Sequence, residues 1–181
     1  MEVEELATCR LKLRKLTPEV FDYIYRDFSE KKQLAFLGLK STVELKVEKN
    51  KYEKGLWTHN KRFLYFQLLD QKCMKIIGWC GYHTWYLDHE RAEIGYGLFD
   101  DKYKRKGLMS EAMYPIIEYG FKQMRLNRIE AFIGPKNEAS IKLINKFNFV
   151  KEGQLREHYR ENDRAEDSIV YSLLRKEYEN C

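Results

Sequence analysis

The sequence predicts an α+β fold with a mixed, mostly antiparallel central sheet of about seven strands and flanking helices. Three consecutive segments in the middle of the chain are rich in β-branched and aromatic residues and are separated by short polar turns, which is typical of an antiparallel meander. The next 50 residues alternate between helix-like and strand-like patterns, and two more strand-like segments follow. Together these observations indicate the α+β class with a mixed central sheet.

The chain of 181 residues fits one domain spanning residues 1–181, because single cores commonly reach this size. A hydrophobic content of 44% is enough for a packed core, and no repeat or Gly/Ser linker suggests an internal boundary. The charged N-terminus lacks the apolar core of a signal peptide, and no run approaches the ~18 apolar residues of a membrane span. We therefore expect a cytoplasmic protein that does not associate with membranes.

Charge and cysteine usage narrow the function classes. The 33 basic and 28 acidic side chains form a mixed surface rather than a basic tract, which argues against direct nucleic-acid binding. Four cysteines, Cys9, Cys73, Cys80 and Cys181, are scattered without the spacing of a zinc site or a disulfide framework. The histidine spacing matches no metal motif either, so we expect no metal.

In the first third of the chain, residues 10–16 alternate apolar and basic side chains like a half-exposed strand. A helix is expected directly afterwards, with Thr17 as its N-cap and Pro18 in its first position. A second helix is expected to begin at Ser41, because Ser41 and Glu44 have the spacing of a capping box.

The middle and the end of the chain supply the remaining elements. The meander strands are expected at residues 62–70, 75–87 and 91–99. They are followed by a helix over 107–124, a strand over 128–133, a helix over 137–147 and two strands between 149 and 174. Pro115 lies inside the first of these helices, where we expect a kink or a slightly later helix start.

A basic loop with a glycine lies where the third meander strand gives way to a helix. Free N–H groups at a helix N-terminus bind anions, and Gly107 would let a phosphate approach the backbone. Solvated lysines ahead of an ordinary helix would give the same pattern. The loop matches neither the P-loop nor the dinucleotide fingerprint, and the nucleophile-elbow motif is absent.

With its surroundings, this loop resembles the GCN5-related N-acetyltransferase (GNAT) family, and within it the RimJ/RimL-like branch that acetylates ribosomal-protein N-termini. The family loop reads approximately Q/R-x-x-G-x-G/A; here Lys replaces Gln/Arg at 104, and Met replaces the final small residue at 109. Asn137 and Ser140 match the branch's N-x-x-S, and Asn148 replaces its usual glycine after the helix, where Asn tolerates the left-handed conformation. The stretch AEIGYGL at 92–98 also looks like the family's fourth strand.

The resemblance, which covers roughly residues 10–174, implies acetyl-CoA as the co-substrate. Backbone groups near Leu98 and Phe99 would pair with its pantetheine arm, and N–H groups from 105 to 109 would hold its pyrophosphate. Asn137 would hydrogen-bond the arm from the other side, besides acting as a helix N-cap. The expected coenzyme-binding residues are Leu98, Phe99, Lys104, Arg105, Lys106, Gly107, Leu108, Met109 and Asn137.

The resemblance also implies two catalytic residues. Many relatives protonate the leaving thiolate with a tyrosine seven positions after the asparagine, but this chain has Ile144 there. Ser140 matches the serine that substitutes in the RimJ/RimL-like branch, although a first-turn serine is also a common structural residue. Glu93 matches an acidic position and would act as the base, with Gly95 and Gly97 on the same strand face leaving room for substrate. A solvated glutamate would look the same, and His83 and His89 are alternative bases.

The sequence therefore predicts an N-acetyltransferase that moves acetyl directly to a primary amine. An N–H near Leu98 would stabilise the oxyanion. The acceptor would be a protein N-terminus, for example that of a ribosomal protein, or a small molecule such as a polyamine or an aminoglycoside. A non-catalytic acyl-CoA-sensing module is the alternative, because Ile144 and Met109 depart from the family pattern. Either a monomer or a homodimer is compatible with the sequence.

Overall fold

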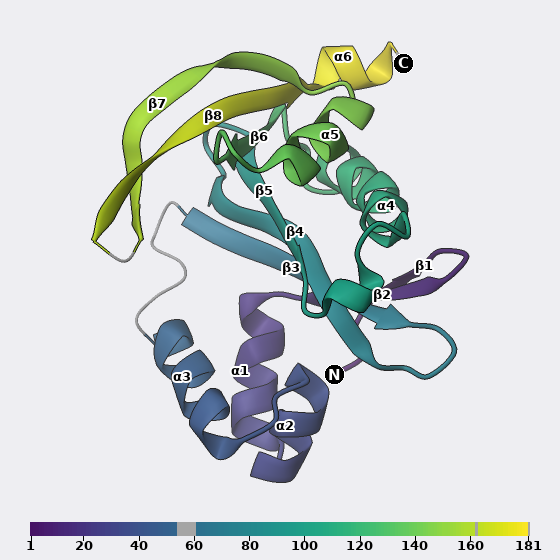
Figure 1. The fold of residues 1–181 in the computed structure, drawn as a ribbon. Helices are drawn as coiled ribbons and strands as arrows, with labels where there is room; N and C mark the ends of the chain where they lie inside the picture. The colour runs from purple at the N-terminus through teal and green to yellow at the C-terminus, as the bar shows by residue number, and fades with distance from the viewer. Residues whose placement is uncertain (54–60, 162, 181) are drawn as a thin grey trace.

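The computed structural model describes residues 1–53, 61–161 and 163–180. Within these ranges, eight strands form one sheet in the order β1-β2-β3-β4-β5-β6-β8-β7 (Figure 1). Cys181, whose thiol the sequence analysis considered, lies outside the described residues. The strands are β1 Glu5–Ala7, β2 Leu11–Leu16, β3 Lys61–Asp70, β4 Ile76–Tyr86, β5 Arg91–Leu98, β6 Arg128–Ile133, β7 Val150–Glu161 and β8 Arg164–Leu174.

The sheet is mostly antiparallel, as predicted. The meander of β3, β4 and β5 and the closing hairpin of β7 and β8 are confirmed. The short strand β1, which pairs with β2, was not predicted and raises the count from about seven to eight in the described ranges. Its three residues are too few to show a periodicity in the sequence.

The neighbouring strands β5 and β6 are parallel and soon separate. Their pairing covers only Arg91 with Arg128, Ala92 with Ile129, and Glu93 with Glu130. Strand β5 continues to Leu98 and β6 to Ile133 without pairing to each other further. The sheet is therefore open between these strands beyond Glu93, and this opening determines where the candidate site lies.

Two predicted helix starts are confirmed. Helix α1 is Pro18–Asp27, and the Thr17 side chain accepts a hydrogen bond from the Val20 N–H. Helix α3 is Thr42–Glu53; the Glu44 N–H donates to Ser41 Oγ at 3.2 Å, and the Glu44 carboxylate accepts from the Lys40 N–H. Between them lies the unpredicted helix α2, Glu30–Leu37, which has no fully buried residue and so no clear apolar pattern.

Helices α4 (Leu108–Lys122) and α5 (Glu138–Lys146) lie next to each other on one side of the sheet (Figure 1). Helix α4 starts at Leu108 and runs through Pro115, so the later start expected there was wrong. Its buried face explains this, since Ala112, Met113 and Ile116 are fully covered by the core and hold the helix on both sides of the proline. The short helix α6, Arg175–Glu179, and the 3-10 turn η1, Asp101–Tyr103, were also unpredicted.

The main core lies between α4, α5 and the sheet. It includes Leu11 and Leu13 of β2, Tyr82 of β4, Ile94 of β5 and Ile144 of α5. A second cluster joins α1 to the edge of the sheet through Leu16, Val20 and Ile24. Among the described helices, none is both long and apolar enough to cross a bilayer.

Candidate active site

A cavity of about 330 Å³ lies where β5 and β6 separate. It opens between the two strands and reaches the first turn of α5. The predicted catalytic residues Glu93 and Ser140 both line it, as does Asn137. The other lining residues are Trp79, His83, Ile94, Gly95, Tyr96, Ala131, Phe132, Ile133, Gly134 and Tyr159.

Glu93 lies on β5 at the last pair before the strands part, and its side chain is only 12% exposed. Burial and, to a smaller extent, the nearby charge of Glu130 together raise the pKa of Glu93 to about 7. Its carboxylate is 3.5 Å from His83 Nδ1. A carboxyl group with a pKa near neutrality can accept and release a proton at physiological pH, as a general base must.

The sequence predicted open space for substrate beside Glu93, but the structure fills that space. A side chain added at Gly95 would lie 2.9 Å from His83 Nε2 and 3.0 Å from Trp79, so these rings already cover that glycine. The small residue therefore makes room for the two rings rather than for substrate. Burial also lowers the pKa of His83, which leaves its imidazole neutral at pH 7.

The neighbouring carboxylate, Glu130, is held by two guanidinium groups. Arg91 Nη1 lies 2.6 Å from one of its oxygens, and Arg128 Nε lies 2.7 Å from the other. Arg128 also pairs with Glu152, which is in turn hydrogen-bonded by Ser172. This network fixes a negative charge close to Glu93, and the repulsion between the two carboxylates favours the protonated form of Glu93.

The opposite wall is the N-terminus of α5. The Asn137 side chain caps the helix by accepting a hydrogen bond from the Ser140 N–H at 3.1 Å. This places the half-buried Ser140 on the cavity, one turn inside the helix. At the other end of α5, Asn148 has φ +59°, the left-handed conformation that the sequence predicted for it.

The directions of the backbone groups along β5 reduce the set of residues that could contact the pantetheine arm. The Phe99 N–H donates to the Ile77 carbonyl at 3.0 Å, so it points toward β4 and is not open to a ligand. Because backbone groups alternate in direction along an antiparallel ladder, those of Tyr96 and Leu98 point the other way, toward the separated β6. Of the predicted pair, Leu98 remains, and its N–H has the direction needed for an oxyanion or an amide carbonyl.

The predicted pyrophosphate loop is exposed and leads into α4. Arg105 has φ +57° and Gly107 has φ +73°, so both turn the chain in the left-handed region. Gly107 is the N-cap of α4 and, having no side chain, makes no cap hydrogen bond of its own. The N–H groups at Leu108 and Met109 are consequently available to an anion, in a loop that carries the basic side chains Lys104, Arg105 and Lys106.

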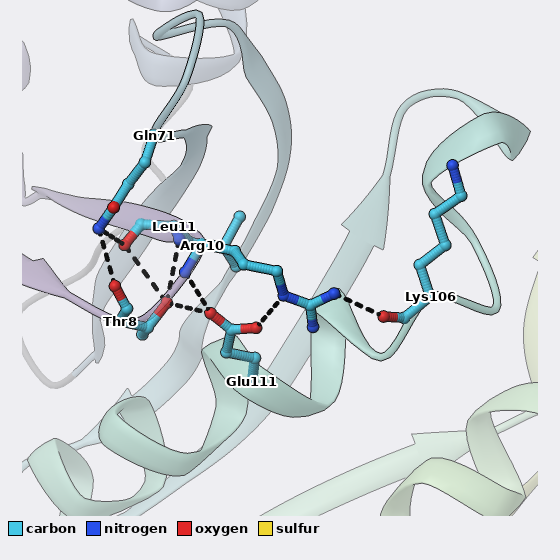
Figure 2. A network of polar contacts seen from close by, with 6 residues as sticks. All are labelled: Thr8, Arg10, Leu11, Gln71, Lys106 and Glu111. Atoms are coloured by element: carbon cyan, nitrogen blue, oxygen red, sulfur yellow. Dashed lines mark hydrogen bonds and ion pairs between the residues drawn. The ribbon is translucent and has the colours of Figure 1, made fainter.

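A polar network that the sequence analysis missed anchors this loop (Figure 2). Arg10 Nε lies 2.6 Å from Glu111 Oε2, and Arg10 Nη1 donates to the Lys106 carbonyl at 3.0 Å. Thr8 Oγ1 and the Arg10 N–H also donate to Glu111, and together these hydrogen bonds outweigh burial and lower the pKa of Glu111. The turn between β1 and β2 thus holds both the loop and the first turn of α4.

The signals for these missed residues were weak or absent. Arg10 and Glu111 are 101 residues apart, and nothing in either local pattern links them. Tyr96 belongs to the family-like stretch at 92–98, but a tyrosine on a strand is more typical of a packing residue than of a catalytic one. His83 was considered only as an alternative base, and the structure places it beside Glu93.

Comparison with known proteins agrees with this geometry. The family model of the acetyltransferase (GNAT) domain matches residues 10–150. An uncharacterised N-acetyltransferase of Bacillus licheniformis is 33% identical over 97% of this chain and 99% of its own. A second one, YoaA of Bacillus subtilis, is 32% identical over 94% of this chain and 96% of its own.

Solved structures share the fold. The ribosomal-protein-S5-alanine acetyltransferase of Vibrio fischeri superposes with a TM-score of 0.67 at 25% identity, covering 97% of this chain and 98% of its own. The spermidine/spermine N-acetyltransferase SpeG of Vibrio cholerae superposes with a TM-score of 0.68 at 22% identity, covering 94% and 98%. The family match and the two bacterial relatives, each aligned over nearly its whole length, establish that this chain belongs to the GNAT family and is an N-acetyltransferase.

Proposed function

We propose that the protein transfers acetyl from acetyl-CoA directly to a single primary amine, most favourably a protein N-terminus, without a covalent enzyme intermediate. Glu93 accepts the amine proton, directly or through water, and Ser140 donates to the departing thiolate. The Leu98 N–H stabilises the oxyanion, and the loop from 104 to 109 holds the pyrophosphate while Asn137 contacts the pantetheine arm. No nucleophilic side chain is required, since the thioester is already activated.

The observation that carries this proposal is the shared cavity. Glu93 comes from the paired end of β5, and Ser140 comes from α5, yet both line one space of about 330 Å³. Transfer to an amine needs a base on the amine side and a proton donor on the sulfur side. An opening through the sheet, with one group at each side, supplies both in the water-poor surroundings that raise the pKa of Glu93.

The charge of the cavity favours an acceptor with one positive charge. Among its described lining residues, Glu93 is the sole carboxylate, and the adjacent Glu130 is already paired with two arginines. A polyamine carries several charges along its length and would leave most of them without a partner. A peptide N-terminus brings a single amine, in line with the ribosomal-protein acetyltransferase among the structural neighbours.

Two measurements test the proposal in sequence. The first is the thermal midpoint with and without acetyl-CoA; a ligand at about 100 times its Kd adds about 2.7 kcal/mol, which would raise the midpoint by several degrees. The second is release of free CoA with peptides bearing N-terminal alanine or serine, compared with spermidine and with an N-terminally blocked peptide. Turnover with the free peptides alone is the expected result.

Each failure has a separate meaning. Faster turnover with spermidine would contradict the argument from cavity charge and assign a polyamine acceptor. A midpoint shift with no turnover on any amine would favour the acyl-CoA-sensing alternative that Ile144 left open. Absence of any shift at millimolar acetyl-CoA would overturn the coenzyme site itself.

A further inference from the structure

The hydroxyl group of Tyr96 is buried and has no hydrogen-bond partner among the residues that the structure describes. Tyr96 lies on β5 with its ring packed against the main core, and it lines the same cavity as Ser140 and Glu93. Because side chains alternate along a strand, Tyr96 points to the side of the sheet that α4 and α5 cover, whereas Glu93 points to the other. The phenol therefore lies on the same side of the cavity as Ser140, the residue proposed to protonate the coenzyme sulfur.

An unpaired buried hydroxyl lowers the stability of the fold and is uncommon. The same face of the sheet shows how the fold can avoid this cost. Tyr82, on the adjacent strand β4, is fully buried, and its hydroxyl donates a hydrogen bond to the Ile116 carbonyl at 2.8 Å. Tyr96 has no such acceptor among the described residues, and it lines the same cavity as Ser140, whose hydroxyl could receive its proton.

Ser140, on the same cavity, carries a hydroxyl oxygen that can receive it. The Ser140 hydroxyl lies close enough to oppose, in part, the rise in the pKa of Tyr96. Burial is the larger effect and raises the pKa of Tyr96 to about 12, which keeps the phenol protonated at neutral pH. Ile144, where many relatives of this family carry a tyrosine, is fully buried and offers no hydroxyl.

Serine alone is a poor proton source. An alkyl hydroxyl is a much weaker acid than a phenol, whose ordinary pKa is about 10. For Ser140 to protonate a leaving thiolate, a second group must return a proton to its oxygen in the same event. Tyr96 is placed to be that group, from the strand rather than from the helix.

We propose that Tyr96 and Ser140 form a proton relay to the coenzyme sulfur, an inference that rests on the proposed acetyl transfer. The amine nitrogen bonds to the thioester carbon, the carbon–sulfur bond breaks, and the electron pair leaves with sulfur. Ser140 Oγ–H protonates that sulfur while Tyr96 Oη–H reprotonates Ser140. The proton released by the amine returns to the Tyr96 phenolate through solvent, so that one amine and one thioester give one amide and one thiol.

The test is a double-mutant cycle with Tyr96→Phe and Ser140→Ala. Tyr96→Phe removes one unpaired oxygen and keeps the ring, so the fold should keep or gain stability. Tyr25→Phe is a matched control, because Tyr25 Oη on α1 is likewise buried and unpaired in the described ranges, away from the cavity lining. The readouts are kcat and KM with acetyl-CoA and the alanine peptide or spermidine, together with the thermal midpoint.

The expected result is a fall in kcat of about 10²-fold for Tyr96→Phe and for Ser140→Ala, with KM for acetyl-CoA within about threefold of wild type. The double variant should be about as slow as the slower single variant, because one relay can be broken only once. Tyr25→Phe should retain wild-type kcat. A role in packing alone would change the midpoint and leave kcat intact.

Two outcomes would overturn the relay while leaving the acetyl transfer in place. One is an active Tyr96→Phe enzyme that resembles Tyr25→Phe. The other is a double variant whose loss is the product of the two single losses, which would assign Tyr96 and Ser140 to separate steps. A wild-type protein that binds acetyl-CoA without turnover would instead remove the proposed function and the relay with it.

Discussion

The two halves of the candidate site, the cavity between β5 and β6 and the loop that leads into α4, use different chemical groups. The cavity between β5 and β6 is formed by side chains that are mostly covered, and burial moves the pKa of Glu93 to about 7. The loop that leads into α4 is exposed, and it offers backbone N–H groups around Gly107 beside solvated lysines. One half depends on a low-dielectric environment, and the other depends on the conformation of the chain.

This difference predicts how each half responds to substitution. In the cavity, replacing one functional group removes a chemical step and should reduce kcat. In the loop, the groups proposed to hold the ligand belong to the backbone, so changes that alter its shape should matter more than changes to its charges. The predictions below test this contrast, from the largest expected effect to the smallest.

Glu93→Gln should have the largest effect on rate. Loss of the base should lower kcat by about 10² or more while acetyl-CoA binding stays unchanged. In the wild type, kcat/KM should rise with pH through about 7, since Glu93 must be ionised to accept a proton. Steady-state kinetics across pH 5.5–9 measure both effects, and a pH-independent wild-type rate would exclude Glu93 as the base.

The same substitution should affect stability in the opposite direction. The pKa of Glu93 is about 7 in the folded state and near its ordinary 4.5 when unfolded, so the unfolded state loses its proton first as pH rises. Wild-type stability therefore falls between these two values, and the glutamine variant escapes this loss. Thermal midpoints at pH 5 and pH 8 should show Glu93→Gln gaining on the wild type at the higher pH only.

Gly107→Ala should weaken coenzyme binding about tenfold and leave kcat at saturation nearly unchanged. Gly107 has φ +73°, where a side chain costs about 1–2 kcal/mol. The added carbon would lie 3.7 Å from Arg10 Nη2, an ordinary contact, so the cost comes from the backbone rather than from a clash. Gly153→Ala is the control, because that glycine has open space and no positive φ. Equal acetyl-CoA affinity in both variants would contradict a backbone-built loop.

Arg10→Ala should have a smaller effect, about fivefold on acetyl-CoA affinity. The side chain ties the Lys106 carbonyl to Glu111, but it is 51% exposed, so solvent reduces the strength of the ion pair. Arg14→Ala, within β2, removes an ion pair with Glu5, away from the loop, and serves as the control. Titration calorimetry distinguishes the two; similar affinities would show that the anchor is dispensable.

Single replacements of the loop cations should have the smallest effect. Lys104→Ala, Arg105→Ala and Lys106→Ala should each change acetyl-CoA affinity by about twofold, and less at high salt, because exposed charges are screened within about 8 Å at physiological ionic strength. Lys31→Ala on α2 provides an exposed control. A loss from any one loop cation larger than that of Gly107→Ala would reverse the contrast between side chains and backbone in this loop.

Much of the fold was predictable because its signals are local. The Thr17 cap with Pro18, the Ser41 start, the meander and the Asn137 cap each depend on residues within a few positions of one another. Helix α2 and strand β1 were missed for the same reason. Their own residues show neither an apolar stripe nor enough length to express one.

By itself the sequence determined the identity and order of most of the elements and the residue types at both halves of the site. Only the tertiary structure decided which of them act together, because these contacts are set by strand register and burial. Strand register directs the Phe99 N–H toward β4 and the Leu98 N–H toward the opening. The packing of the turn between β1 and β2 against α4 places Arg10 next to Glu111. Burial raised the pKa of Glu93 and left the Tyr96 hydroxyl without a partner among the described residues, on the cavity that Ser140 also lines. These properties depend on distant neighbours and on the exclusion of water, which no local pattern records.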